Sequence, residues 1–258
     1  MPELVRYDVD AGVARITLDS PHNRNALSRQ LTAELAASVD SAIANAEVRM
    51  LLLTANGTVF CSGADLKEQR DANQSGGSTG PTALAPILEA MWHAPKPVVG
   101  RINGAARAGG IGLVAACDIA VGVDDATFAV NEVRIGVIPA IISVILLRKL
   151  AMPVAMELFL TGEPFDGKRA AEIGLMNQAV PASELDAATD RYLAQIRLGA
   201  PGAMGGAKRL VREVPALGLH EGFEAMAELS ASYFASPEAL EGMTAFAEKR
   251  PPSWAKAD

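Results

Sequence analysis

The first stretch of the chain alternates between apolar and polar side chains. Residues 4–9 and 13–18 both follow this pattern, and the short segment Asp10-Ala11-Gly12 separates them. Side chains of a β-strand point alternately to its two faces, so the pattern predicts a β-hairpin with one buried face. The chain is therefore expected to open with two antiparallel strands.

A longer period follows the hairpin. Ser28 precedes a segment in which apolar residues recur at every fourth position, namely Leu31, Leu35, Val39 and Ile43. This spacing defines one face of a helix, and serine is a favoured residue at a helix N-terminal cap. Residues 50–54 are then almost continuously apolar, which predicts a strand covered on both faces.

The same reasoning divides the chain up to residue 180 into further elements. Strands are expected at 98–102, 119–121, 127–129 and 175–180. Helices are expected at 84–92, 108–116, 141–150, 152–160 and 166–173, the last between a capping Asp166 and a terminating Gly174. Asp65 is expected in the first turn of another helix, where its charge complements the helix dipole. Residues 69–82 are rich in Gly and Ser and predict a surface loop, which is either a linker or a lid over residues 62–67.

From residue 181 onward the pattern indicates helices alone, at 183–196, 203–214, 219–234 and 237–249. Ser236 is expected to cap the last of them. We therefore place a domain boundary near residue 200, between a layered α/β body and a helical region over 201–258. That region is expected to pack on something else, and another subunit is a candidate.

Composition narrows the possible classes of protein. The formal net charge is −7, so the chain lacks the basic surface that general nucleic-acid binding needs. The two cysteines, Cys61 and Cys117, lie far apart and only three histidines are present, which favours neither a zinc site nor a disulfide framework. The start of the chain is acidic and alternating, unlike a secretory signal, and the longest apolar run, 137–147, is too short to span a bilayer. We expect a cytoplasmic protein that binds neither nucleic acid nor membrane.

Two features suggest chemistry. A helix that begins at Gly109 and Gly110 presents backbone N–H groups that could bind a phosphate or a developing oxyanion. Alone, such glycines more commonly serve close packing of a helix on a strand. Glu132 follows some twenty residues later and is either a surface acid or a catalytic carboxylate.

Several stretches taken together resemble the crotonase superfamily, which includes the enoyl-CoA hydratases and isomerases. The matching segments, in family order, are PHNRNAL at 21–27, FCSGADLKE at 60–68, PKPVVGRINGAARAGG at 95–110, ACDIAVG at 116–122, NEVRIGVIP at 131–139, LTGEPFDGKRAAEIGL at 160–175 and EGMTAFAEKRPP at 241–252. The resemblance covers nearly the whole chain. It implies an α/β fold built as a spiral of repeated ββα units over residues 1–200, with a C-terminal all-helical trimerisation region over 201–258.

The resemblance also implies a substrate and a set of site residues. The substrate would be an acyl-CoA thioester, and the protein a homotrimer or a hexamer of paired trimers, with no metal or separate cofactor. The backbone N–H groups of Ala64 and Gly109 would hold the thioester carbonyl. Coenzyme A would lie along Ser62, Ala64, Asp65, Leu66 and Lys67, and Arg24 and Lys249 are either phosphate contacts or ordinary surface cations. The acyl pocket would include Ala106, Gly110, Gly112 and Pro139.

One departure from the family pattern concerns the catalytic acids. Hydratases of this family commonly carry two glutamates, and here Gly112 stands at the first position while Glu132 keeps the second. With one base, Glu132 could activate water for addition to a 2-enoyl-CoA, or it could carry a proton between C2 and C4 as an isomerase does. The segments AGGIGLVAACDIAVG and NEVRIGVIPAIIS resemble the branch that hydrates branched enoyl-CoAs of the methylglutaconyl-CoA type, so we favour a hydratase.

Two further alternatives stay open from the sequence. A non-catalytic acyl-CoA-binding or RNA-binding relative would need no Glu132, and the acidic balance argues against RNA. Arg134 could face a carboxylate on the substrate, or it could form a structural ion pair.

Overall fold

The computed structural model describes residues 2–74 and 83–255. Ten strands lie in this part of the chain: β1 (Val5–Asp10), β2 (Val13–Leu18), β3 (Met50–Ala55), β4 (Val59–Cys61), β5 (Val98–Ile102), β6 (Ala105–Arg107), β7 (Ile119–Val123), β8 (Thr127–Ala129), β9 (Phe165–Asp166) and β10 (Gln178–Val180). Its α-helices are α1 (Arg29–Ala44), α2 (Leu66–Gln74), α3 (Leu84–His93), α4 (Gly109–Ala116), α5 (Ala140–Lys149), α6 (Met152–Thr161), α7 (Gly167–Glu172), α8 (Leu185–Arg197), α9 (Pro201–Glu213), α10 (Leu219–Phe234) and α11 (Pro237–Ala247). Short 3-10 helices include η1 (Pro21–Asn23), η2 (Glu132–Ile135) and η3 (Ala182–Glu184).

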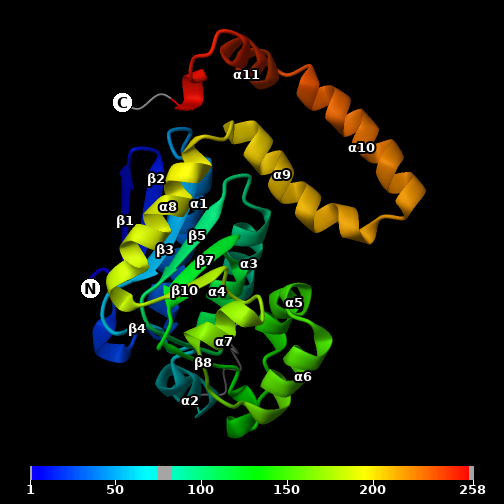
Figure 1. The fold of residues 1–258 in the computed structure, drawn as a ribbon. Coiled ribbons are helices and arrows are strands. Elements are labelled where there is room, and N and C mark those ends of the chain that lie inside the picture. The colour runs from blue at the N-terminus through cyan, green and yellow to red at the C-terminus, as the bar shows by residue number, and fades with distance from the viewer. Residues whose placement is uncertain (1, 75–82, 256–258) are drawn as a thin grey trace.

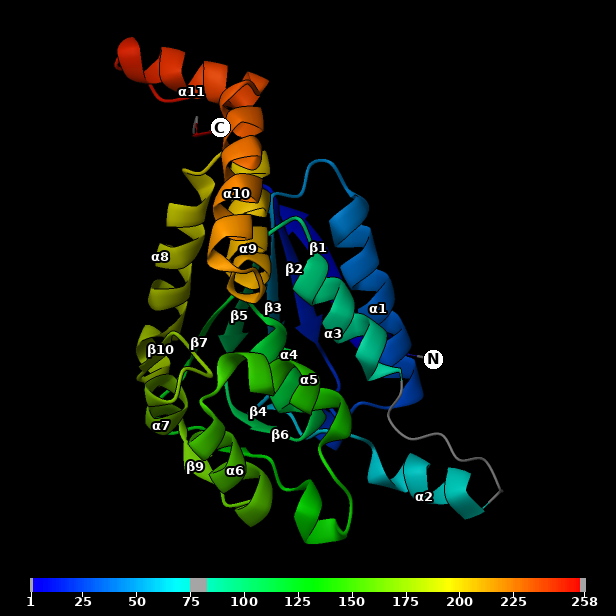
Figure 2. The same cartoon turned by 90° about the vertical axis from the view of Figure 1, so that its right-hand side faces the viewer.

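The strands form two sheets, and the chain visits them in turn. The larger sheet has the order β1-β2-β3-β5-β7-β10, and the smaller has the order β4-β6-β8-β9. From β3 to β8, one strand enters the larger sheet, the next enters the smaller sheet, and helices follow (Figures 1 and 2). This repetition is the expected spiral of ββα units. Both sheets are mainly parallel; the antiparallel pairs are β1 with β2 and β8 with β9.

Most local predictions are confirmed. The opening hairpin pairs Val5 with Leu18 through to Asp10 with Val13. Ser28 caps α1 by accepting a hydrogen bond from the N–H of Leu31, and the carboxylates of Asp65 and Asp166 accept from the first turns of α2 and α7. Every residue of β3 is buried, as its continuous apolar run indicates.

Two expectations differ from the structure. The part of the expected surface loop that the structure describes, residues 69–74, belongs to α2, because Asp65 starts a helix that runs through these polar residues. Residues 75–82 of that loop lie outside the described residues. The strand expected at 175–180 is shorter, since Leu175 and Met176 instead form the turn that ends α7 and hydrogen-bond to the carbonyl of Ala170.

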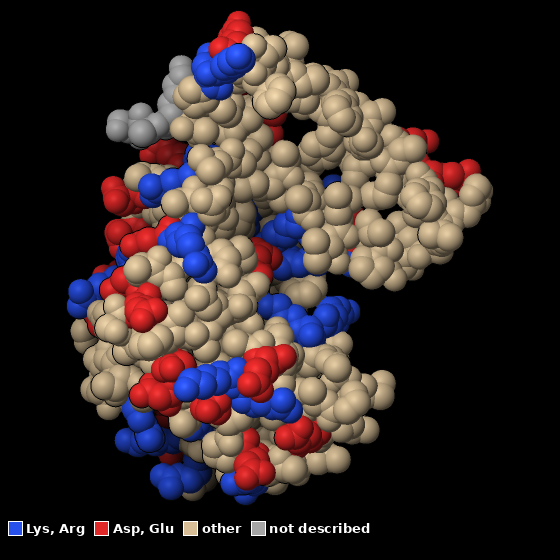
Figure 3. Space-filling model, in the orientation of Figure 1, with Lys and Arg blue, Asp and Glu red and all other residues tan. Residues whose placement is uncertain are grey.

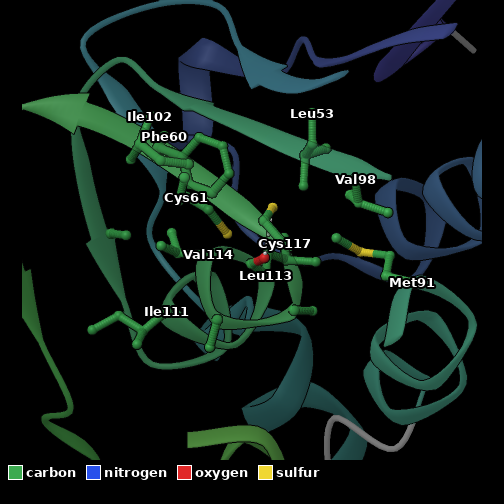
Figure 4. Packing of buried hydrophobic residues seen from close by; sticks show 14 of the residues in the cluster. Leu53, Phe60, Cys61, Met91, Val98, Ile102, Ile111, Leu113, Val114 and Cys117 are labelled. Carbon is green, nitrogen blue, oxygen red and sulfur yellow. Dashed lines mark hydrogen bonds between the residues drawn. The ribbon is translucent and has the colours of Figure 1, made fainter. Parts of the chain in front are cut away.

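Helix α4 lies in the middle of the molecule. All eight of its residues are buried, and it contacts α3, α5, β4, β5 and β6. Figure 4 shows Leu113 and Val114 of this helix, together with Cys117, packed among Phe60 and Cys61 of β4 and Val98 of β5. Both cysteines are free and fully enclosed, and burial raises the pKa of each thiol to about 12. These thiols therefore serve as packing groups.

The C-terminal helices leave this body. Helix α8 packs on β5 and β7, and α9 is anchored by Lys208 and Arg212, whose side chains pair with Asp118. Helices α10 and α11, called the C-terminal arm below, project away from both sheets (Figure 2). The arm is mostly uncharged in Figure 3, and it exposes large apolar side chains: Leu219, Phe223, Phe234, Leu240, Met243 and Phe246.

Candidate active site

Three candidate residues follow the ends of three neighbouring strands. Strands β4, β6 and β8 are parallel neighbours, so their carboxyl ends lie at the same edge of the smaller sheet. Ala64 follows β4, Gly109 follows β6 and Glu132 follows β8. The smaller sheet therefore brings together residues that are far apart in the chain, at the edge where open parallel sheets bind their ligands.

The loop that carries Ala64 is held by the early segment around Arg24. The N–H of Ser62 donates to the carbonyl of Arg24 at 3.1 Å, and the N–H of Leu27 donates to the carbonyl of Gly63 at 2.8 Å. The buried Asn25 side chain adds a bond from Nδ2 to the carbonyl of Val59 at 2.8 Å. These bonds join the PHNRNAL segment to the FCSGAD segment, so the first segment, called the brace below, holds the loop of the second in place.

The second loop is in contact with the first. Gly63 lies so close that a methyl group there would be 3.5 Å from the amide nitrogen of Gly109 and 3.0 Å from Cβ of Ala108. Ala108 has φ 46° and ψ −117°, a backbone conformation that L residues rarely adopt, and its N–H donates to the carbonyl of Ala129. This kink directs the chain from β6 straight into the first turn of α4.

Two backbone donors are unused at this junction. Within residues 2–74 and 83–255, neither the N–H of Ala64 nor that of Gly109 has a protein acceptor. The first N–H groups of a helix have no intrahelical partner, and the helix dipole places positive potential beside them. The junction can therefore stabilise an oxygen atom that gains negative charge.

Glu132 opens the 3-10 helix η2 and is half-buried. Its Oε2 atom is buried and has no hydrogen-bond partner in the described part of the chain. Burial raises the pKa of this carboxyl, and a hydrogen bond from the backbone of Glu132 itself opposes the shift only in part. A partly desolvated carboxylate with a free oxygen is suited to accept and return a proton.

The position of the missing first glutamate is filled by packing. A methyl group at Gly112 would lie 2.6 Å from Cγ2 of Ile142 on α5 and 3.3 Å from Cδ1 of Leu88 on α3. Ile142 and Leu88 are both buried. Neither residue was predicted to belong to the site. The signal that could have revealed them is the run of bulky apolar residues after Pro139. A helix that left room for a side chain at position 112 would carry smaller residues there.

The other predicted pocket residues are placed as follows. Ala106 is fully buried in β6, and Gly110 packs so tightly that a methyl group would lie 2.5 Å from the carbonyl oxygen of Cys61. Pro139 is buried at the N-terminal end of α5. Arg134 donates from Nε to the carbonyl of Thr161 at 3.0 Å, which ties η2 to the end of α6.

The predicted coenzyme A contacts fall into two groups. Ser62, Asp65, Leu66 and Lys67 lie together where the first loop enters α2, and Arg24 is exposed beside them in the brace described above. Lys249 is exposed just after α11, at the opposite end of the molecule in Figure 1. One chain by itself therefore does not bring Lys249 to the other candidates.

Comparison with known proteins agrees with this architecture. Residues 8–257 match the enoyl-CoA hydratase/isomerase family, and the chain belongs to that family, which is part of the crotonase superfamily. A crystal structure of an enoyl-CoA hydratase from Mycobacterium smegmatis is 31% identical, with a TM-score of 0.88 over 98% of this chain and 99% of that chain.

Two further relatives have nearly the same sequence identity to this chain. Pseudomonas aeruginosa AtuE is 32% identical, with a TM-score of 0.93 over 98% of this chain and 100% of that chain. The mouse protein named enoyl-CoA hydratase domain-containing protein 3, mitochondrial, is 32% identical over 98% of this chain and 85% of its own length. Within residues 2–74 and 83–255, every helix is too short or too polar to span a bilayer.

Proposed function

We propose that this protein is an enoyl-CoA hydratase that uses Glu132 as its one catalytic carboxylate. The observation that carries the proposal is the meeting of Ala64, Gly109 and Glu132 at one edge of the smaller sheet, with two free N–H donors and a free buried carboxylate oxygen. Relatives named as enoyl-CoA hydratases support the substrate class.

The two N–H groups would act on the thioester carbonyl. Addition of a nucleophile at C3 of a 2-enoyl thioester moves electrons onto the carbonyl oxygen and creates an enolate. Donors that are already oriented stabilise this charge more than they stabilise the neutral substrate, so they lower the barrier. One such donor is typically worth about 3 kcal/mol.

Glu132 would serve in both directions of proton transfer. Its ionised carboxylate takes a proton from water as the water oxygen bonds to C3, and the resulting carboxylic acid then protonates C2 of the enolate. The net change is the addition of one water molecule across the double bond. A carboxyl whose pKa is raised by burial is a better match to both steps than an exposed glutamate is.

The isomerase alternative has one specific observation in its favour. Ile142 and Leu88 close the space above Gly112, so position 112 supplies no second carboxylate to hold water. In that reaction Glu132 removes a proton from C2 of a 3-enoyl-CoA and returns it to C4, and the same N–H pair holds the dienolate oxygen. A protein that only binds acyl-CoA would turn over neither substrate.

Product mass distinguishes these functions. We would incubate the protein with straight and branched 2-enoyl- and 3-enoyl-CoAs and compare the wild type with Glu132→Gln. A hydratase adds the mass of one water, and Glu132→Gln should slow this reaction by about 10²- to 10⁴-fold because the general acid-base group is lost. Glu184→Gln, an exposed glutamate in η3, is the matched control and should keep full activity.

Other outcomes identify the alternatives. An unchanged mass with a shifted double bond would establish the isomerase instead. Equal background rates from the wild type and Glu132→Gln would leave acyl-CoA binding as the function.

The exposed apolar surface of the C-terminal arm supports a proposal about assembly. Phe223 is 71% exposed, Phe234 70% and Phe246 88%, and exposed apolar surface of this kind marks sites where proteins associate. We expect the arm to pack on further copies of the chain as a trimer or a pair of trimers. In that assembly, Lys249 of one subunit would contact the coenzyme A bound to a neighbouring subunit. Light scattering would measure the mass of the assembly.

A further inference from the structure

The turn that carries Glu132 has little contact with the core. None of the residues of η2 is buried. Its backbone hydrogen bonds are local: Arg134 N–H donates to Asn131, Gly136 N–H to Val133 and Val137 N–H to Glu132. These bonds define the shape of the turn, but they do not fix its position relative to the N–H groups of Ala64 and Gly109. Some other contact must do so.

The carboxylate of Glu132 does not supply this contact either. Its Oε2 atom has no hydrogen-bond partner among the described residues, so the orientation of the side chain depends on the placement of its backbone. The strand before the turn, β8, is fixed by its pairing with β6 and β9. The open question is what holds the turn on the side beyond Glu132.

The C-terminal end of α6 meets the turn at this point. Nε of Arg134 donates to the carbonyl of Thr161, the last residue of α6, at 3.0 Å. The last carbonyl groups of a helix have no intrahelical partner, and the helix dipole makes this end negative. A guanidinium group therefore satisfies both the free carbonyl and the local charge, even though the side chain is exposed.

Gly162 makes a second contact with the same turn. It has φ 58°, and a methyl group on it would lie 3.2 Å from Nε of Arg134 and 3.2 Å from Cα of Asn131. Asn131 and Arg134 flank Glu132 in the chain, so α6 touches the turn on both sides of the base. A larger residue at position 162 would push the end of α6 away from the turn.

The chain after Gly162 then returns to the strand that precedes Glu132. Phe165 of β9 stacks on Phe128 of β8 with ring centroids 5.9 Å apart. Residues 161–165 thus contact the segment around Glu132 both before η2 and within it. These residues belong to the LTGEPFDG stretch, which contributes no group to the proposed chemistry.

We propose that Arg134 and Gly162 are positioning residues, which hold η2 against the end of α6 and thereby place the Glu132 carboxylate opposite the two N–H donors. This inference rests on the proposed role of Glu132 as the catalytic base. It gives Arg134 a role within the protein, in place of the contact with a substrate carboxylate that the sequence left open.

Kinetics of Arg134 variants test the inference. Arg134→Met keeps the length of the side chain but removes the donor and the charge, and Arg134→Lys keeps a charged donor. Arg148→Met is the matched control, because Arg148 also donates to a helix carbonyl, that of Val144, but lies outside η2. With the substrate identified by product mass, kcat, KM, thermal midpoint and the pH dependence of kcat/KM would be measured for each variant.

The expected result separates positioning from stability. Arg134→Met should lower kcat by about 10- to 100-fold with little change in KM, since a base displaced by about 1 Å loses this much rate. The acidic limb of its pH profile should move to lower pH, because a looser turn lets water reach the carboxylate and relieves the raised pKa. Arg134→Lys should recover part of kcat, and Arg148→Met should match the wild type.

Several outcomes would overturn the inference. They are an unchanged kcat and pH profile for Arg134→Met, a loss of thermal midpoint alone, an equal loss in Arg148→Met, or a KM increase confined to acyl-CoAs that carry a second carboxylate. If Arg134→Met does not fold, Gly162→Ala must show the same selective loss of kcat. A fully active Glu132→Gln would defeat the proposed function itself, whereas an inactive Glu132→Gln beside a normal Arg134→Met would defeat only this inference.

Discussion

Helix α4 and the 3-10 helix η2 supply the two halves of the proposed site, and the two elements differ in burial. All eight residues of α4 are buried, whereas none of the residues of η2 is. The backbone donor at Gly109 is therefore held by packing from every side. The proposed base, Glu132, follows the paired strand β8, and beyond it the turn meets the end of α6 through one hydrogen bond and one close glycine contact.

This difference follows from what each half must do. Backbone donors gain most when they are rigid and shielded from water, and close packing in the core provides both. A proton-transfer group must be desolvated enough to raise its pKa and open enough to meet substrate and water. Substitutions in α4 should therefore act mainly on stability, and substitutions in η2 mainly on activity.

The largest effect on stability is expected at the contact between Ile142 and Gly112. Ile142→Ala should cost about 2–5 kcal/mol, because it removes a buried side chain from the wall above α4. Gly112→Ala should be destabilising in the wild type but tolerated when combined with Ile142→Ala, since the clashing Cγ2 atom is gone. Urea unfolding of the wild type, the two single variants and the double variant measures the coupling free energy between the two positions, which we expect to be at least about 0.5 kcal/mol. Additive changes would show that Ile142 does not exclude a side chain at position 112.

A methyl group on Gly110 comes next in size. Gly110→Ala would place Cβ 2.5 Å from the carbonyl oxygen of Cys61, and this backbone atom cannot rotate away. Overpacking of this kind costs about 1–3 kcal/mol. Gly136→Ala is the control at η2, where nothing lies within 4 Å and only the positive φ of 78° carries a cost of about 1–2 kcal/mol. If Gly136→Ala lowered the urea midpoint more than Gly110→Ala, the contrast between the two regions would be wrong.

The pH dependence of stability tests the burial of Glu132. Because its pKa is higher in the folded protein than in the unfolded chain, the folded protein keeps a proton between these two values that the unfolded chain has lost. The contribution of Glu132 is fully present below the unfolded pKa and is lost as the pH rises through the folded pKa. The thermal midpoint of the wild type should thus fall relative to that of Glu132→Gln as the pH rises above the ordinary glutamate pKa of 4.5. Parallel curves for the two proteins would mean that the carboxyl is as well hydrated as an ordinary glutamate.

The smallest effect is expected at Ala108, which has a positive φ and lies beside the proposed oxyanion donors. Ala108→Gly removes the cost of a positive φ for an L residue but adds conformational freedom to the unfolded chain. These opposing terms should leave a gain of less than about 1 kcal/mol and an unchanged kcat. A clear loss of activity with normal stability would indicate that the Ala108 side chain itself helps to place the Gly109 N–H.

Some features of the fold could be predicted because they depend on local patterns. The opening hairpin, the Ser28 cap of α1 and the C-terminal helices all follow from side-chain period and capping chemistry. Strands β4, β6 and β9 have only two or three residues and were not predicted, although the equally short β8 was. The expected loop at 69–74 was wrong because a capping Asp65 outweighed the polar composition of the segment that follows.

The sequence by itself determined the family of this protein, the strands that make up its larger sheet, and the residues expected to act, since each of these is expressed in neighbouring residues or in ordered motifs. Only the tertiary structure decided how the site is built. Strands β4, β6 and β8 meet through pairings between distant segments, Ile142 reaches Gly112 from another helix, and Arg134 reaches Thr161 across the end of α6. These contacts join residues that no local pattern relates, because they form only when distant segments of the chain are brought together by strand pairing, core packing and hydrogen bonding.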